Sequence, residues 1–201
     1  MSRSGLLDPS QAGLSRLGTF VEAITALLDR TDDERAILAD GASHLAALVA
    51  HDDWLPDAHA QPDPERYRQY LLYRDPGARF CVVSFVWGPR QATPIHDHTI
   101  WGLVGVLRGS ELAERFAHSD QGLQRIGGER LIAGDIDAVS PIIGDLHRVS
   151  NASPDSVSIS IHVYGADIGA VERAIYDLDG TRRPFVSGYA DAPVPLLSGE
   201  A

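Results

Sequence analysis

Residues 93–102 read TPIHDHTIWG, and they contain two histidines separated by one residue, His96 and His98. Side chains alternate between the two faces of a β-strand, so a strand here presents both imidazoles on one face and turns Asp97 away. A third histidine, His147, follows far along the chain. Three imidazoles can fill one face of a metal's coordination sphere and leave other positions open. We therefore predict a metal site formed by His96, His98 and His147.

Short apolar runs separated by glycines surround this segment. They predict strands at 80–87, 101–107, 111–116, 124–126, 130–132, 137–139 and 157–164. Closely spaced short strands with glycine turns are typical of an antiparallel barrel or sandwich. Residues 78–180 are therefore predicted to form a β-barrel.

The first 77 residues have a mainly helical pattern. Apolar residues between 14 and 28 recur at three- and four-residue spacing, which predicts an amphipathic helix. A second helix is expected after the capping region 31–33, with Gly41 as a candidate break. Asp63-Pro64-Glu65 predicts the start of a third helix that runs through Leu72. Residues 181–201, rich in Pro, Gly and Ser, are expected to wrap the surface irregularly, so that 1–201 forms a single domain.

Composition restricts the class of protein. The chain has 201 residues, enough for one domain with a sizeable core, and a formal net charge of −11. That charge argues against a surface that binds nucleic acid or an anionic membrane, but it leaves room for a local basic pocket. The segment that begins with residues 1–5 lacks the long apolar run of a signal peptide, so none is expected. No stretch approaches the roughly 18 apolar residues of a membrane span. Because Cys81 is the single cysteine, no intrachain disulfide can form, and a cytoplasmic location is expected.

A second segment strengthens the prediction of a metal site. It contains Gly134, Pro141, Gly144, His147 and Asn151. Together with His96, His98 and Gly109, these residues resemble the two motifs of the cupin superfamily. The resemblance implies a double-stranded β-helix barrel, or jelly roll, with a metal inside its mouth and the helical segment as a cap. Gly102 stands where the cupin motif has a glutamate, which leaves three neutral ligands and no carboxylate.

The run SISIHVY at 158–164 alternates strictly and brings Ser160, His162 and Tyr164 to one strand face. One interpretation is a polar face in contact with solvent, and the other is a polar row that lines the barrel interior. The order Ser-x-His-x-Tyr after the third metal histidine resembles the cysteine dioxygenase family. This resemblance implies a catalytic triad in which Ser160 orients His162 and His162 orients the Tyr164 hydroxyl.

The resemblance spans roughly 67–173 and is closer to the bacterial branch, the 3-mercaptopropionate dioxygenases. It implies a mononuclear Fe(2+) site that adds both atoms of O2 to the sulfur of a small thiol carboxylic acid, giving a sulfinic acid. Gly102 matches the cysteine that animal enzymes crosslink to tyrosine, so an uncrosslinked Tyr164 is expected. Gln69 matches a glutamine of the bacterial branch, and Arg173 matches the arginine that binds the substrate carboxylate.

Several alternatives stay open at this point. Arg173 could form a surface ion pair with Glu172 or Asp177, and Arg74 is a rival anchor for the carboxylate. The chain could be a cysteine dioxygenase proper, or a metal cupin that is an isomerase or a ligand-binding module, since fold does not determine function. The preferred thiol, the oligomeric state and the pathway are not predicted.

Overall fold

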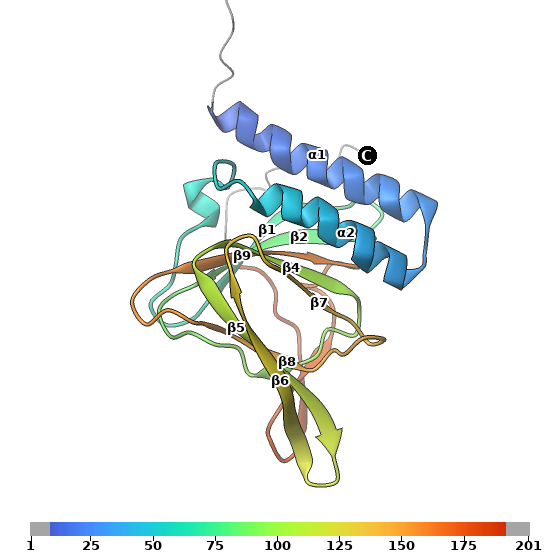
Figure 1. The fold of residues 1–201 in the computed structure, drawn as a ribbon, viewed down its shortest axis with the longest axis vertical. Helices are drawn as coiled ribbons and strands as arrows, with labels where there is room; N and C mark the ends of the chain where they lie inside the picture. Colours follow the sequence, from blue (N-terminus) through green and yellow to red (C-terminus); the bar gives the residue numbers. More distant parts are fainter. Residues whose placement is uncertain (1–8, 192–201) are drawn as a thin grey trace, which may run out of the picture.

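The structure is a computed structural model that describes residues 9–191. Within that range the chain forms a five-stranded sheet with the order β1-β2-β9-β4-β7 and a six-stranded sheet with the order β11-β10-β3-β8-β5-β6 (Figure 1). The strands are β1 (Arg68–Arg74), β2 (Cys81–Trp87), β3 (Ile95–His96), β4 (Gly102–Arg108), β5 (Ser110–Ser119), β6 (Gly122–Ile132), β7 (Ile136–Val139), β8 (His147–Asn151), β9 (Ser158–Tyr164), β10 (Arg173–Tyr176) and β11 (Arg182–Phe185). The predicted fold class, a mainly β structure with a helical N-terminal part, is confirmed.

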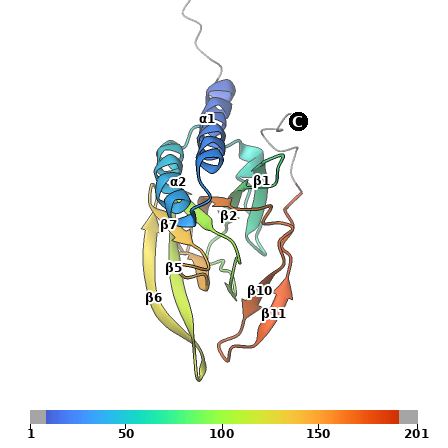
Figure 2. The same ribbon diagram turned by 90° about the vertical axis from the view of Figure 1, so that its right-hand side faces the viewer.

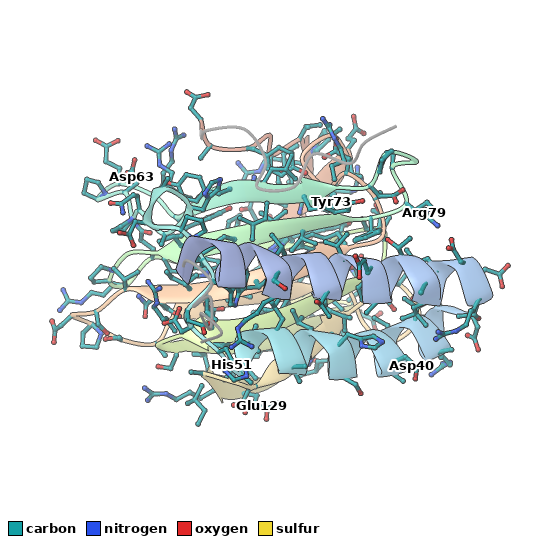
Figure 3. All side chains as sticks on the ribbon, turned by 90° about the horizontal axis from the view of Figure 1, so that it is seen from above. Asp40, His51, Asp63, Tyr73, Arg79 and Glu129 are labelled. Carbon is teal, nitrogen blue, oxygen red and sulfur yellow. The ribbon has the colours of Figure 1, made fainter. Side chains whose placement is uncertain are left out.

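Two helices precede the strands, α1 (Pro9–Arg30) and α2 (Glu34–Val49), as predicted. They lie side by side over the outer face of the five-stranded sheet (Figures 1 and 3). Gly41 does not break α2, which runs continuously from Glu34 to Val49. A Cβ at position 41 would meet Leu103 Cδ1 of β4 at 2.8 Å. The glycine lets the helix approach the sheet closely, so the centre of the sheet is covered from outside.

The predicted third helix is wrong. Residues 68–74 form β1, which pairs antiparallel with β2 at the edge of the five-stranded sheet. The Asp63 side chain does accept hydrogen bonds from the backbone N–H groups of Glu65 and Arg66, as a helix cap would. The chain then leaves this turn as a strand, since Tyr70 and Leu72 are buried in the core under the helices. Pairing with β2 therefore outweighs the local helix-start signal. A short 3-10 helix, η1 (Asp57–His59), precedes this turn.

The prediction of an irregular C-terminal segment is also wrong in part. Residues 182–185 form β11, which pairs with β10 at one edge of the six-stranded sheet. Figure 2 shows β10 and β11 on one side of the molecule and β5 and β6 on the other. The predictions for residues 1–5 and for 192–201 lie outside the described residues. The predicted runs 124–126 and 130–132 belong to one strand, β6. Neither helix within 9–191 is long and apolar enough to cross a membrane.

The start of α2 offers a test of the helical cap. Asp33 lies at the N-cap, and its Oδ1 accepts a hydrogen bond from Arg35 N at 3.0 Å. We expect Asp33→Ala to lower the free energy of unfolding by about 1 kcal/mol in urea denaturation, since the orphaned N–H loses its acceptor. The neighbouring Asp32→Ala should leave stability almost unchanged, because Asp32 is exposed and does not cap the helix. Equal losses in the two variants would contradict the capping role.

Candidate metal centre

Three buried histidines converge inside the barrel. His96 on β3 pairs directly with His147 on β8, and His98 follows β3 by two residues, just before Thr99 with a φ of 62°. The Nε2 atoms of His96 and His147 lie 3.2 Å apart. One potential ligand atom from each of the three rings lies within 4.8 Å of the others. Among residues 9–191, these histidines are the group of His, Cys, Asp or Glu side chains that is close enough to hold a metal ion. The rings therefore meet as predicted, although β3 ends at His96 and does not include His98.

Neighbouring acceptors fix which nitrogen of two of these rings carries the proton. The His96 Nδ1–H donates to the carbonyl oxygen of Pro94 at 3.1 Å, because a carbonyl can only accept. His98 Nδ1–H donates to Asp145 Oδ1 at 2.9 Å, and the same carboxylate accepts the backbone N–H groups of His98 and Thr99. The Nε2 atoms of His96 and His98 are then unprotonated in the neutral rings, as metal-ligating histidines require.

The surroundings favour neutral imidazoles. Burial lowers the pKa of His96 to about 4 and the pKa values of His98 and His147 well below their usual range. Neutral imidazole is the form that binds zinc, copper, iron and nickel. Asp97 turns away and accepts hydrogen bonds from Ala174 N at 2.8 Å and the Tyr176 hydroxyl at 2.7 Å. The three histidines therefore fit a metal ion, and the ligand set contains no carboxylate.

A hydrogen-bonded row on β9 points toward the same space. Ser160 Oγ lies 2.9 Å from His162 Nε2, and His162 Nδ1 lies 2.8 Å from the Tyr164 hydroxyl. The indole N–H of Trp87 donates to Ser160 Oγ at 3.2 Å. All of these groups are buried, so the polar face of β9 faces the interior and the interpretation of a solvated face is excluded. Burial lowers the pKa of His162 to about 3 and raises the pKa of the Tyr164 phenol, which keeps both groups neutral.

Gly102 and Tyr164 fit each other closely. The two residues pair across β4 and β9, and a Cβ at position 102 would lie 2.8 Å from the Tyr164 ring. The ring of Tyr164 also stacks on the ring of His98, with centroids 5.5 Å apart. Cys81 pairs with Tyr164 from the other side, on β2, and burial raises the pKa of its thiol to about 11. A larger residue at 102 would displace the tyrosine ring from its position beside the histidines.

A cavity of about 210 Å³ joins the histidines, the β9 row and the two predicted substrate-binding residues. Its wall includes His96, His147, His162, Tyr164, Gln69 and Arg173, with Tyr67, Phe85, Trp87, Phe185 and Ser187 among the remaining residues. The structure therefore brings the predicted ligands, the triad and the carboxylate-binding candidates to one place. His98 is buried behind the cavity wall.

Arg173 is buried, with 4% of its surface exposed. Its Nη2 donates to Ser187 Oγ at 2.8 Å, and its guanidinium lies over the Phe185 ring at 4.7 Å. Its Nε has no hydrogen-bond partner among residues 9–191. The burial of Arg173 excludes the alternative that it forms a surface ion pair, and Asp177 pairs with Arg183 instead. A buried cation with an unused N–H is suited to bind an anion.

The rival anchor, Arg74, lies elsewhere. It is exposed and pairs with Asp167 at 2.6 Å, and it is not part of the cavity wall. Gln69 does reach the cavity, but its amide Nε2 donates to the carbonyl oxygen of Gly188 at 2.6 Å. The glutamine therefore ties the segment after β11 to β1 and adds no charge to the cavity.

The family follows from comparison with known proteins. The family model described as cysteine dioxygenase type I matches residues 11–174. The chain belongs to the cysteine dioxygenase type I family. Membership implies an oxidoreductase with thiol dioxygenase activity, and the three-histidine cluster can hold the metal ion that such activity uses.

Solved structures with similar folds include two bacterial proteins. An uncharacterized conserved protein with a double-stranded β-helix domain from Klebsiella pneumoniae is 21% identical, with a TM-score of 0.45, and the match covers 60% of this chain and 93% of that one. A cupin superfamily protein from Desulfitobacterium hafniense is 14% identical, with a TM-score of 0.42, and the match covers 58% of this chain and 94% of that one.

Four residues of the site were missed from sequence alone: Asp145, Trp87, Phe185 and Ser187. Asp145 lies two residues before His147, which is a weak signal because carboxylates are common beside histidines. Trp87 lies at the end of a predicted strand, and nothing in the sequence indicated that its indole contacts Ser160. Phe185 and Ser187 lie in the segment expected to be irregular, so nothing local related them to Arg173.

Asp145 is expected to control metal binding by this member of the family. Asp145→Asn removes the charge that orients His98, and such neighbouring carboxylates typically contribute about 10- to 100-fold to metal affinity. A fluorescence or calorimetric titration with Fe(II) under anaerobic conditions measures the loss. The matched control is Asp155→Asn, which lies in an exposed turn. Unchanged affinity in Asp145→Asn would show that His98 is not held by this contact.

Proposed function

We propose that the protein is a non-heme Fe(II) thiol dioxygenase that converts a small thiol carboxylic acid, with 3-mercaptopropionate preferred, to its sulfinic acid. The reaction adds both atoms of O2 to the sulfur, so one thiol and one O2 give one sulfinate and one proton. The observation that carries this proposal is one cavity whose wall includes His96, His147, Tyr164 and Arg173. His98 completes the histidine cluster behind that wall, and the Nε of the buried Arg173 has no hydrogen-bond partner among residues 9–191.

His96, His98 and His147 would hold the metal ion. When bound there, Fe(II) would lower the pKa of the substrate thiol and supply the redox chemistry that zinc lacks. Three neutral ligands leave the full 2+ charge in the site, which favours an anionic substrate. Pro94 and Asp145 keep the Nε2 lone pairs of His96 and His98 directed inward, and burial keeps competing protons off the rings.

Arg173 would bind the substrate carboxylate. The guanidinium can offer two parallel N–H donors to a carboxylate, and a charge-assisted bond is strongest where water is excluded. Tyr67, Phe85 and Trp87 pack on one another along the wall, with ring centroids between 4.8 and 6.0 Å apart, and give this wall an apolar surface. The separation of Arg173 from the histidines would then set the length of the acid that fits.

The cavity supports a substrate without an amino group. None of the described residues in its wall is Asp or Glu, and the side chain of Gln69 is already bonded to Gly188. The ammonium group of cysteine would therefore enter a desolvated space beside a cationic arginine with no counter-charge. 3-Mercaptopropionate carries the same thiol and carboxylate without that penalty.

Tyr164 would act as a hydrogen-bond donor to the reacting groups. Its phenol stays protonated because burial raises its pKa, and His162 lies within hydrogen-bond distance of its oxygen. Ser160 in turn orients His162, so the side chains form a rigid row. With Gly102 at the position of the crosslinking cysteine, Tyr164 is proposed to act without a thioether bond. The single cysteine supports a cytoplasmic location.

Oxygen uptake tests this function. We expect protein loaded anaerobically with Fe(II) to consume one O2 per thiol and to give a sulfinate, with a higher kcat/KM for 3-mercaptopropionate than for cysteine. Zinc-loaded protein is the control and should be inactive, since zinc has no redox chemistry. A preference for cysteine would identify a cysteine dioxygenase proper. Metal binding without sulfinate formation from either thiol would indicate an isomerase or a ligand-binding cupin and reject the proposal.

Variants of the arginine test the carboxylate anchor. Arg173→Ala should raise KM for 3-mercaptopropionate by roughly 10- to 100-fold, the equivalent of one lost charge-assisted bond. Gln69→Ala should raise it far less, because a neutral amide that is bonded to Gly188 contributes no charge. Arg74→Ala is the matched control for loss of a cation and should leave KM unchanged, since Arg74 pairs with Asp167 outside the cavity. Similar effects of Arg173→Ala and Gln69→Ala would mean that the anchor is misassigned.

A further inference from the structure

Glu111 on β5 is a fully buried carboxyl group that has no part in the metal cluster or the cavity wall. Its Oε1 lies 3.0 Å from the hydroxyl of Ser158, and its Oε2 makes no hydrogen bond within residues 9–191. Ser160 lies two residues beyond Ser158 on the same face of β9, and its hydroxyl acts on the pKa of the Glu111 carboxyl. Ser160 is the first member of the β9 row, so Glu111 lies at the end of that row farthest from the cavity.

Hydrogen-bond counting at Ser158 favours a neutral Glu111. The Ser158 hydroxyl has one proton, but it lies within hydrogen-bond distance of two acceptors, the Arg108 carbonyl oxygen at 2.9 Å and Glu111 Oε1 at 3.0 Å. Both contacts are satisfied together only when Glu111 carries a proton and donates it to Ser158, because the carbonyl cannot donate. An ionised Glu111 would leave one acceptor without a donor.

Charged side chains on the neighbouring strands pair with groups other than Glu111. On β5 and the adjoining β4, Glu114 pairs with Arg125 and Arg148, and Arg108 pairs with Asp52. On β6, Arg130 donates to Ser110. The groups that act on the pKa of Glu111 are the hydroxyls of Ser158 and Ser160 on β9, and burial outweighs them and raises that pKa to about 7. The nearest titratable group along the row is His162, which lies beyond Ser160.

The row from Ser160 to Tyr164 can carry its hydrogens in two directions. His162 is neutral, so only one of its two ring nitrogens bears a proton. In the inward direction Ser160 donates to Nε2, Nδ1–H donates to the Tyr164 oxygen, and the phenol hydrogen is free to point into the cavity. In the outward direction the Tyr164 hydroxyl donates to Nδ1, Nε2–H donates to Ser160, and the Ser160 proton turns to Glu111. The Trp87 indole donates to Ser160 in either case.

We propose that Glu111 is a positioning residue whose protonation state sets the direction of this row, and through it whether Tyr164 offers its hydrogen to the cavity. A neutral carboxyl competes weakly for the Ser160 proton, and the row then runs inward. An ionised carboxylate is a much stronger acceptor, since charge-assisted bonds are roughly twice as strong as neutral ones, and the row then runs outward. The chemical consequence rests on the proposed function, whereas the direction of the row is a property of the chain itself.

The row can be read directly by ¹⁵N NMR of His162 in the full chain, loaded with zinc as a diamagnetic ion. The shifts of Nδ1 and Nε2 distinguish the two neutral tautomers. We expect the Nδ1–H form below neutral pH and the Nε2–H form above it. Glu111→Gln cannot ionise and should hold the Nδ1–H form throughout. A His162 tautomer that is the same at all pH values in the wild type would overturn the proposal, even if the variant failed to fold.

A pH profile then links the row to activity. Above the titration of Glu111, kcat/KM of the wild type should fall by about tenfold per pH unit, because the competent form is depleted in proportion. Glu111→Gln should remove this decrease and keep the activity seen at lower pH. Glu114→Gln, which alters the next acid on the same strand, should leave the profile unchanged.

A decrease of equal size in Glu111→Gln and the wild type would overturn the role of Glu111. Tautomer switching without any sulfinate formation would reject the proposed function and retain the proposal for the row.

Discussion

The antiparallel pairing of His96 on β3 with His147 on β8 is the contact on which the site depends. It places the two Nε2 atoms 3.2 Å apart, and the segment after β3 places His98 beside them. A shift of one residue in this register would turn His147 to the opposite face. Pro94 and Asp145 then orient the rings of His96 and His98, so the backbone and one carboxylate create a cation site from neutral groups.

The two sheets contribute different chemistry to the same cavity. The six-stranded sheet supplies His96, His147 and Arg173, and the segment after β3 supplies His98. The five-stranded sheet supplies the row on β9 and most of the aromatic wall. Because α1 and α2 cover the outer face of the five-stranded sheet, β9 is buried on both faces. That burial keeps His162 and Tyr164 neutral and fixes their mutual distance, which an exposed strand would not do.

Alternation along strands was the most reliable signal in the sequence. It predicted the common face of Ser160, His162 and Tyr164, because the period of two follows from backbone geometry. Asp97 also turns away as predicted, although β3 ends before it. The sequence pattern led to a wrong prediction of a helix at 63–74, because the turn at Asp63 resembles a helix cap. Residues 68–74 form a strand because they pair with β2. Strand alternation also could not predict contacts between segments that are distant in the sequence. Ser187 meets Arg173 only because β11 pairs with β10, and no local pattern encodes that meeting.

We propose that this site joins both atoms of one O2 to the sulfur of a thiol acid. Isotopically labelled O2 tests it most directly, with Fe(II)-loaded protein, 3-mercaptopropionate and mass spectrometry of the product. A dioxygenase should give a sulfinate in which both oxygen atoms carry the label. A product without label, with label in only one oxygen, or without sulfur oxidation would contradict it.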